Sequence, residues 1–189
     1  MAAADLTRVL LSLEEAEAMT AVGGATPAAV LVAVFDWPEA PGLVFTERRA
    51  DLRRHAGEIS FPGGRRDPGE DLLTTALREA EEEIGLSRDD VELAGALPPV
   101  GTFISGYRVH PYVGVIPAGL AFEPSPREVA AVLLFQLDEL RKGYAMRRLV
   151  RRGVPIKTPT YEVGDHLIWG ATARILGELL ERLEPQPPR

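Results

Sequence analysis

The stretch that most constrains the fold is "ISFPGGRRDPGEDLLTTALREAEEEIGL", residues 59 to 86. It begins as a loop rich in glycine and proline and continues as a helix. At 3.6 residues per turn one stripe of that helix is apolar: Leu73, Ala76, Leu77, Ala80 and Ile84. The helix therefore needs a sheet or a second helix to pack against.

The same helix has an unusual concentration of acidic residues, with five glutamates between Glu70 and Glu83. Glu79, Glu82 and Glu83 share one face, and like charges at this spacing destabilise a helix by a few tenths of a kcal/mol per pair. Within the cluster, Arg78 is the only basic residue. A solvated acidic face is one interpretation. The other is a site for a hard divalent cation, which prefers oxygen ligands.

The spacing of these residues resembles the Nudix box, in which each fixed residue stands at a fixed offset. The matching residues are Gly64, Glu70, Arg78, Glu79, Ala80, Glu82, Glu83, Ile84, Gly85 and Leu86. Every fixed position is filled, which makes a chance match very improbable. The resemblance implies an α/β/α sandwich with a mixed sheet, in which the box forms a loop, a helix and a loop. It also implies hydrolysis of a nucleoside diphosphate linked to another group, with Mg²⁺ or Mn²⁺.

The resemblance also implies roles for individual residues. Glu79, Glu82 and Glu83 would hold the metal, with the carbonyl of Gly63 as a further ligand. Glu70 and Arg78 would orient the cluster, and Glu70 and Gly85 would support the box structurally. Glu82, Glu83 and Arg78 are therefore candidate catalytic residues. Metal ions suit this chemistry because they neutralise the diphosphate and lower the pKa of a bound water.

Glu128 is a further candidate catalytic residue. It precedes the predicted strand "VAAVLLF", and in the wider family a glutamate just before a late strand often binds a second metal or acts as the base. One subgroup of the family usually has an asparagine just upstream, whereas this chain reads "EPSPRE".

The stretch upstream of the box, residues 45 to 64, resembles the additional motif of coenzyme A pyrophosphatases. The residues that match are Arg53, Gly57, Phe61, Pro62, Gly63 and Gly64, with His55 at a position that the subgroup favours. The candidate substrate-binding residues are Arg53, His55, Gly57, Phe61 and Gly64. An arginine fork suits phosphate oxygens, whereas His55 could either contact phosphate or cap a loop.

The leading hypothesis is hydrolysis of coenzyme A and its thioesters to 3′,5′-ADP and 4′-phosphopantetheine or its acyl form. The first alternative is another nucleoside diphosphate such as ADP-ribose or NADH, and the second is an inactive nucleotide-binding module. The expected partner is a small nucleotide. The net charge of −7 disfavours nucleic acid. The basic segment 141–157 could reach a phosphate, pair with a second subunit in a homodimer, or simply be solvated.

The rest of the chain predicts one domain over residues 1–189. Residues 1–25 would form a helical extension, with a helix over 5–19, and residues 184–189 a disordered tail. Strands are expected at 28–35, 43–48, 91–97, 109–116 and 129–135, followed by a hairpin that turns at 164–165 and a helix from about residue 171.

Two features favour a cytoplasmic location. The chain has no cysteine, which fits a reducing compartment. Its N-terminus has Glu14 and Glu15 where a signal peptide would be apolar. Its longest apolar run, residues 28 to 35, is too short to span a membrane.

Overall fold

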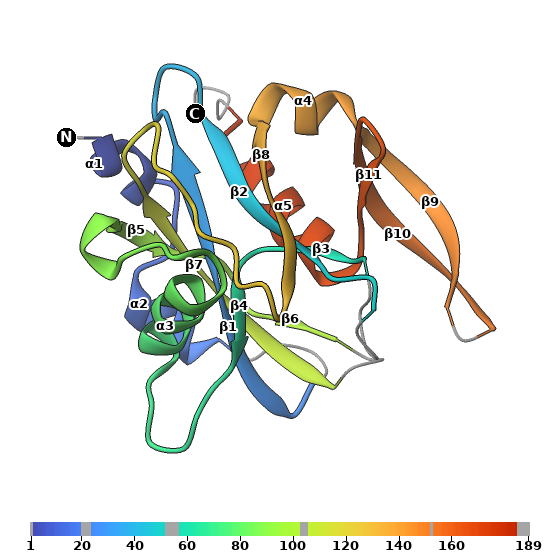
Figure 1. Ribbon diagram of the computed structural model, residues 1–189, viewed down its shortest axis with the longest axis horizontal. Coiled ribbons are helices and arrows are strands. Elements are labelled where there is room, and N and C mark those ends of the chain that lie inside the picture. The colour runs from blue at the N-terminus through green and yellow to red at the C-terminus, as the bar shows by residue number, and fades with distance from the viewer. Residues whose placement is uncertain (1, 20–23, 52–56, 103–105, 152, 185–189) are drawn as a thin grey trace.

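The computed structural model describes residues 2–19, 24–51, 57–102, 106–151 and 153–184. Helices lie on both faces of a central sheet, and a second, smaller sheet extends to one side (Figure 1). In the described part of the chain, no helix is long and apolar enough to cross a membrane.

The central sheet is built around two parallel strands, β1 (Thr26–Phe35) and β7 (Tyr107–Val115). β2 (Gly42–Arg48) and β4 (Gly63–Arg65) pair with β1, and β5 (Glu92–Ala96) and β6 (Val100–Gly101) pair with β7. β3 (Ile59–Ser60) and β8 (Val129–Gln136) pair with β2. All these added pairs are antiparallel, so the sheet is mixed, and the five strands predicted from sequence are confirmed.

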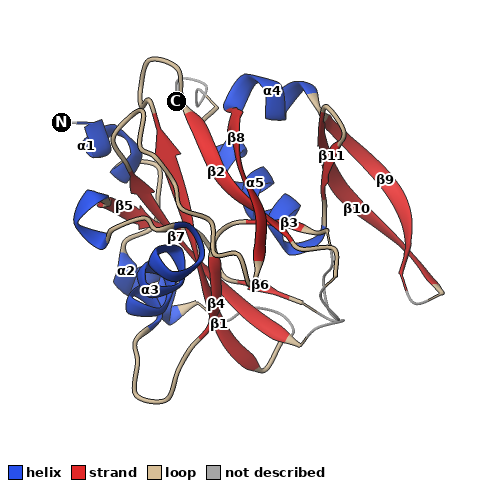
Figure 2. Ribbon diagram, viewed as in Figure 1, coloured by secondary structure: helices blue, strands red, loops and turns tan. Residues whose placement is uncertain are grey.

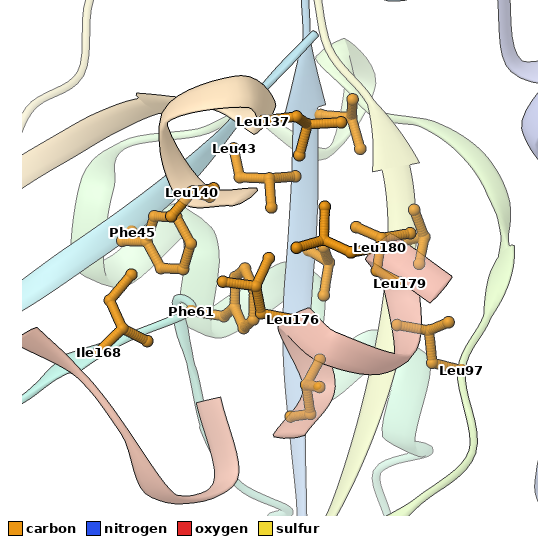
Figure 3. Packing of buried hydrophobic residues seen from close by; sticks show 14 of the residues in the cluster. Leu43, Phe45, Phe61, Leu97, Leu137, Leu140, Ile168, Leu176, Leu179 and Leu180 are labelled. Atoms are coloured by element: carbon orange, nitrogen blue, oxygen red, sulfur yellow. The ribbon is translucent and has the colours of Figure 1, made fainter. Parts of the chain in front are cut away.

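Two hydrophobic clusters hold helices against opposite faces of this sheet. α3 (Leu72–Ile84) contributes Ala76, Ala80 and Ile84 to one cluster. α5 (Gly170–Arg182) contributes Leu176, Leu179 and Leu180 to the other, where they pack with residues of β2 and α4 (Leu137–Lys142) (Figure 3). The predicted α/β/α sandwich is therefore confirmed (Figure 2).

The prediction of one helix over residues 5–19 was wrong. The structure has two short helices, α1 (Ala2–Thr7) and α2 (Leu13–Ala18), separated by a turn over residues 8–10 and an isolated β-bridge at Leu11. Two local interactions explain the break. Leu11 exchanges backbone hydrogen bonds with Ala96 of β5, and Ser12 forms a capping box with Glu15 that starts a new helix.

The basic segment 141–157 is largely β-structure. Most of it lies in a hairpin of β9 (Tyr144–Arg151) and β10 (Val154–Val163), which β11 (His166–Ile168) extends. The hairpin projects from the rest of the molecule (Figure 1). The predicted turn at 164–165 is confirmed because Val163 pairs with His166. A 3-10 turn, η1 (Arg88–Asp90), completes the described elements.

Phe61 is a core residue, which corrects the expectation that it contacts substrate. Its side chain is only 2% exposed and stacks on Phe45 of β2, with ring centroids 4.7 Å apart. Figure 3 shows both rings within the cluster under α5. The buried Phe61 side chain therefore anchors the Phe-Pro-Gly-Gly loop, which leads into the box, to the hydrophobic core.

We expect Phe61→Ala to destabilise the protein by about 3–5 kcal/mol, because it leaves a cavity in a packed core. For a chain of this size the melting temperature should fall by roughly 10 °C. Phe61→Leu, which keeps most of the volume, should lose much less. A melting temperature of Phe61→Ala equal to that of the unchanged protein would contradict this placement.

Candidate functional site

Capping interactions define both ends of the glutamate-rich helix α3. At the N-terminal end, the Asp71 carboxylate accepts a hydrogen bond from the Thr74 N–H at 2.8 Å. At the C-terminal end, Gly85 adopts a left-handed conformation (φ 69°), and its N–H donates to the carbonyls of Ala80 and Glu81. The structural role predicted for Gly85 agrees with this geometry, since a side chain there would be strained.

Arg78 is the electrostatic centre of the site. Its Nε donates to Glu70 Oε1 at 2.9 Å and its Nη2 to Glu70 Oε2 at 3.2 Å, a bidentate pair. Its Nη1 lies 3.0 Å from Glu79 Oε1 and 3.1 Å from Glu82 Oε2. One guanidinium group thus contacts three box glutamates and offsets the repulsion that the sequence suggests.

Glu70 is held from several directions. Besides Arg78, it accepts hydrogen bonds from the buried Thr75 hydroxyl at 2.8 Å and from the Asp67 N–H at 3.3 Å. The bonds from Arg78 contribute most to lowering the pKa of Glu70 to about 2. Glu70 therefore stays ionised and keeps Arg78 oriented. Sequence reasoning missed Thr75, although a polar residue beside an apolar stripe signals a buried hydrogen bond.

Two consecutive glycines bring the box loop against the helix. The Gly63 N–H donates to Glu83 Oε2 at 3.1 Å, and a Cβ at Gly63 would overlap the Ala29 carbonyl of β1. A Cβ at Gly64 would overlap the carboxylate of Glu79. Glycine is thus required at Gly63, where a side chain would meet backbone atoms, whereas a side chain at Gly64 would displace the carboxylate of Glu79. The structure places the Gly63 amide at the cluster, and metal ligation by its carbonyl stays a prediction.

The acidic residues differ sharply in environment. Glu83 is 8% exposed, and this burial, together with the nearby Glu79 and Glu128, raises its pKa to about 7 against the opposing effects of the Gly63 N–H and Arg48. Burial also raises the pKa of Glu79, with Arg78 opposing the shift. The Glu82 side chain is 60% exposed. Glu83 and Glu79 are thus the carboxyl groups that would gain most from a nearby cation.

Glu128 lies at this cluster although 45 residues separate it from Glu83 (128 − 83). Its charge contributes to the raised pKa values of both Glu79 and Glu83. Arg48 Nη1, at the end of β2, lies 3.5 Å from Glu128 Oε2. The structure therefore brings together Glu128 and the box, as the family resemblance implies. The pairing of Arg48 with Glu128 was not predicted from the sequence.

The donor set suits Mg²⁺ or Mn²⁺, since Glu79, Glu82, Glu83 and Glu128 supply carboxylate oxygens. As the described side chains stand, no group of three or more Asp, Glu or His residues is close enough together to hold one ion. Arg78 and the Gly63 N–H engage oxygens of three of these glutamates. A cation would have to draw Glu79 and Glu82 away from Arg78.

The substrate-binding candidates upstream of the box are only partly placed. Arg53 and His55 lie outside the described residues. Gly57 is exposed and lines a pocket of about 250 Å³ between β3 and the junction of β11 with α5. The other lining residues are Glu47, Glu58, Ile59, Asp165, His166, Leu167 and Trp169. Three acidic side chains suit hydrogen-bond donors such as hydroxyl or amide groups better than phosphate.

Comparison with known proteins places this arrangement among enzymes. A family model described as the NUDIX domain matches residues 25–153. An uncharacterized Nudix hydrolase, NudL, from Cronobacter sakazakii is 42% identical over 163 residues, which cover 85% of this chain and 84% of that protein. The NudL of Photorhabdus laumondii is 39% identical over 160 residues, 83% of this chain and 84% of that protein.

A solved structure shows the same fold at lower identity. The Nudix hydrolase RenU from M. smegmatis superposes with a TM-score of 0.60 at 19% sequence identity, and the match covers 95% of this chain and 98% of that one.

The raised pKa of Glu83 predicts how stability depends on pH in the metal-free protein. Folding raises this pKa from 4.5 to about 7, so the folded state holds the proton more tightly than the unfolded state. Its contribution to stability is fully present below pH 4.5 and is lost as the pH rises to about 7. Glu83→Gln lacks this titration. In EDTA at pH 8 it should therefore be more stable than the unchanged protein by about 2 kcal/mol.

Thermal unfolding at pH 4 and pH 8 measures this effect. The advantage of Glu83→Gln should be present at pH 8 and absent at pH 4. An identical difference at both pH values would show that Glu83 titrates normally.

Proposed function

We propose a specific substrate for this chain, which belongs to the NUDIX family and is a Nudix pyrophosphohydrolase. In this proposal it hydrolyses the diphosphate bond of coenzyme A and its thioesters. The products would be 3′,5′-ADP and 4′-phosphopantetheine or its acyl form. Nudix hydrolases act on small nucleotide substrates and generally use divalent ions such as Mg²⁺ or Mn²⁺.

The observation that supports this substrate is the Phe-Pro-Gly-Gly sequence that joins the upstream motif to the box. Phe61 is anchored in the core, and Gly63 and Gly64 contact Glu83 and Glu79. The Phe-Pro-Gly-Gly end of the motif is thus packed against the glutamates of the box. Arg53, six residues before Ile59 (59 − 53), is the proposed phosphate-binding residue of this motif, with His55 beside it in sequence.

In the proposed mechanism, Glu79, Glu82 and Glu83 would hold the metal ion. When bound, the cation neutralises the diphosphate and lowers the pKa of a water molecule. Glu70 keeps Arg78 beside the cluster, and Glu128 contributes a further carboxylate that accepts a proton or a second ion. Overall, water adds its oxygen to one phosphorus, the bridging P–O bond breaks, and the departing phosphate takes the electron pair.

A second candidate is hydrolysis of another nucleoside diphosphate, such as ADP-ribose or NADH. The acidic pocket beside Gly57 favours it, since sugar hydroxyls could donate to Glu47, Glu58 or Asp165. The same pocket could instead accept amide N–H groups of the pantetheine arm. An inactive nucleotide-binding module is a weaker alternative because every fixed residue of the box is intact.

Substrate preference tests the proposal directly. We expect kcat/KM for coenzyme A to exceed that for dephospho-coenzyme A by about tenfold to a hundredfold, because a phosphate bound by charged groups contributes about 1.5–3 kcal/mol. Initial rates with Mg²⁺ or Mn²⁺ and mass analysis of the products measure this ratio, with ADP-ribose as a third substrate. Equal kcat/KM on all three would refute recognition of the 3′-phosphate.

The metal assignment has its own test. Glu82→Gln removes a charged oxygen ligand without changing the shape of the side chain, so kcat should fall about a hundredfold or more. Glu81→Gln is the matched control, since Glu81 is exposed and outside the fixed positions of the box. It should keep normal kcat. Full activity in Glu82→Gln would rule out Glu82 as a metal ligand.

A further inference from the structure

Hydrogen bonds hold the backbone around Glu128 on two sides. Towards the box helix, the N–H groups of Glu123 and Ser125 donate to the carbonyls of Ile84 and Glu83 at 2.9 and 2.8 Å. These bonds satisfy carbonyls at the C-terminal end of α3 that the helix itself leaves unpaired. The segment that leads to Glu128 is thus tied to the residue whose carboxyl lies at the centre of the site.

On the other side, the segment is tied to the end of β2 by Arg49. The Arg49 N–H donates to the carbonyl of Glu128 at 3.0 Å, and its Nη1 donates to the carbonyl of Pro126 at 2.6 Å. Both bonds reach main-chain atoms, so Arg49 fixes the backbone and leaves the Glu128 side chain free to rotate. That carboxylate needs a separate restraint.

Arg48 supplies that restraint. A register shift in the pairing of β2 with β8 lies between Glu47 and Arg48. Arg48 Nη1 lies 3.5 Å from the Glu128 carboxylate, and the positive charge of Arg48 also acts on Glu83. Arg48 therefore lies near both the Glu128 carboxylate and the buried carboxyl group of Glu83 in α3.

The energetics argue that this pair serves position more than stability. The side chains of Arg48 and Glu128 are 36% and 53% exposed, and ion pairs of this kind contribute about 0–1 kcal/mol. The Arg48 Nε is buried and has no hydrogen-bond partner within the described part of the chain, which costs free energy. The small stabilisation from the ion pair is thus offset by the cost of the buried Nε, so Arg48 adds little to the stability of the folded protein.

We infer that Arg48 is a positioning residue that holds the Glu128 carboxylate beside Glu79 and Glu83 for the reaction. This inference rests on the proposed function, because it assigns Arg48 a role in the same site. It differs from phosphate binding, in which Arg48 would contact the substrate directly and act independently of Glu128.

A double-mutant cycle separates the two roles. Arg48→Met should lower kcat about tenfold or more, because a misplaced catalytic group can cost up to about a hundredfold, while KM changes less than twofold. Arg48→Lys should recover part of the loss. In a Glu128→Gln background, Arg48→Met should have no further effect on kcat. Arg8→Met is the control, since it removes an exposed Arg–Asp pair with Asp5 near the N-terminus, away from the glutamate cluster.

Three outcomes would overturn the inference. A rise in KM at constant kcat would mean that Arg48 binds substrate. Multiplicative losses in the double variant would mean that Arg48 acts independently of Glu128. A change in kcat no larger than that of Arg8→Met would mean that Arg48 has no role in the site.

A second measurement does not depend on the substrate or the metal. In EDTA, the shift in melting temperature caused by Arg48→Met should differ by about 2 °C between the unchanged protein and the Glu128→Gln background, because only the former has the ion pair. A shift of equal size in both backgrounds would show that the two residues do not interact. If the protein cleaves ADP-ribose and not coenzyme A, the proposed substrate fails, and the kinetic cycle run with ADP-ribose still decides the role of Arg48.

Discussion

The bidentate pair between Arg78 and Glu70 is the interaction on which the site depends. It joins the loop before α3 to the middle of that helix, across eight residues of sequence, at donor–acceptor distances of 2.9 and 3.2 Å. The remaining Nη1 group of Arg78 then contacts Glu79 and Glu82. Because the guanidinium is planar and rigid, fixing one edge on Glu70 also fixes where the other edge points. The positions of three glutamates are coupled through this one group.

Carboxyl groups of the same type acquire opposite properties within this small region. Arginine and hydroxyl donors lower the pKa of Glu70 to about 2, whereas burial beside other acids raises the pKa of Glu83 to about 7. Glu70 therefore behaves as a permanent anion that organises the site. Glu83 holds its proton up to about pH 7, and a nearby positive charge would favour its ionisation, so proton loss and cation binding at Glu83 are linked.

The sequence predicted the parts of the fold in which one signal dominates. The continuous apolar run of β1 and the apolar stripe of α3 have few alternatives, and Asp71 and Gly85 mark the helix ends. Prediction failed where a local polar contact overrode periodicity, as at Ser12, whose capping box with Glu15 divides the N-terminal helix. It failed differently at Phe61, since a motif shows that a residue is required and does not show whether it contacts ligand or core.

In the candidate site, residues on one helix could be predicted from the sequence, whereas contacts between distant segments could not. Fixed offsets along one helix made Glu79, Glu82 and Glu83 predictable, because helical geometry converts spacing directly into a shared face. Contacts that join distant segments, such as Arg48 with Glu128 or the Gly63 N–H with Glu83, depend on strand register and carry no sequence spacing of their own.

The arrangement of charges would also let Arg78 give up two of its partners to a metal ion without leaving the site. A cation that draws Glu79 and Glu82 towards itself removes two of the carboxylates that Arg78 contacts. Glu70 remains, because its low pKa keeps it ionised, Arg78 contacts both of its oxygens, and Thr75 and the Asp67 N–H hold it in place. We therefore expect Arg78 to stay paired with Glu70 in both states, so that binding a cation exchanges partners within the cluster and leaves no buried charge unpaired.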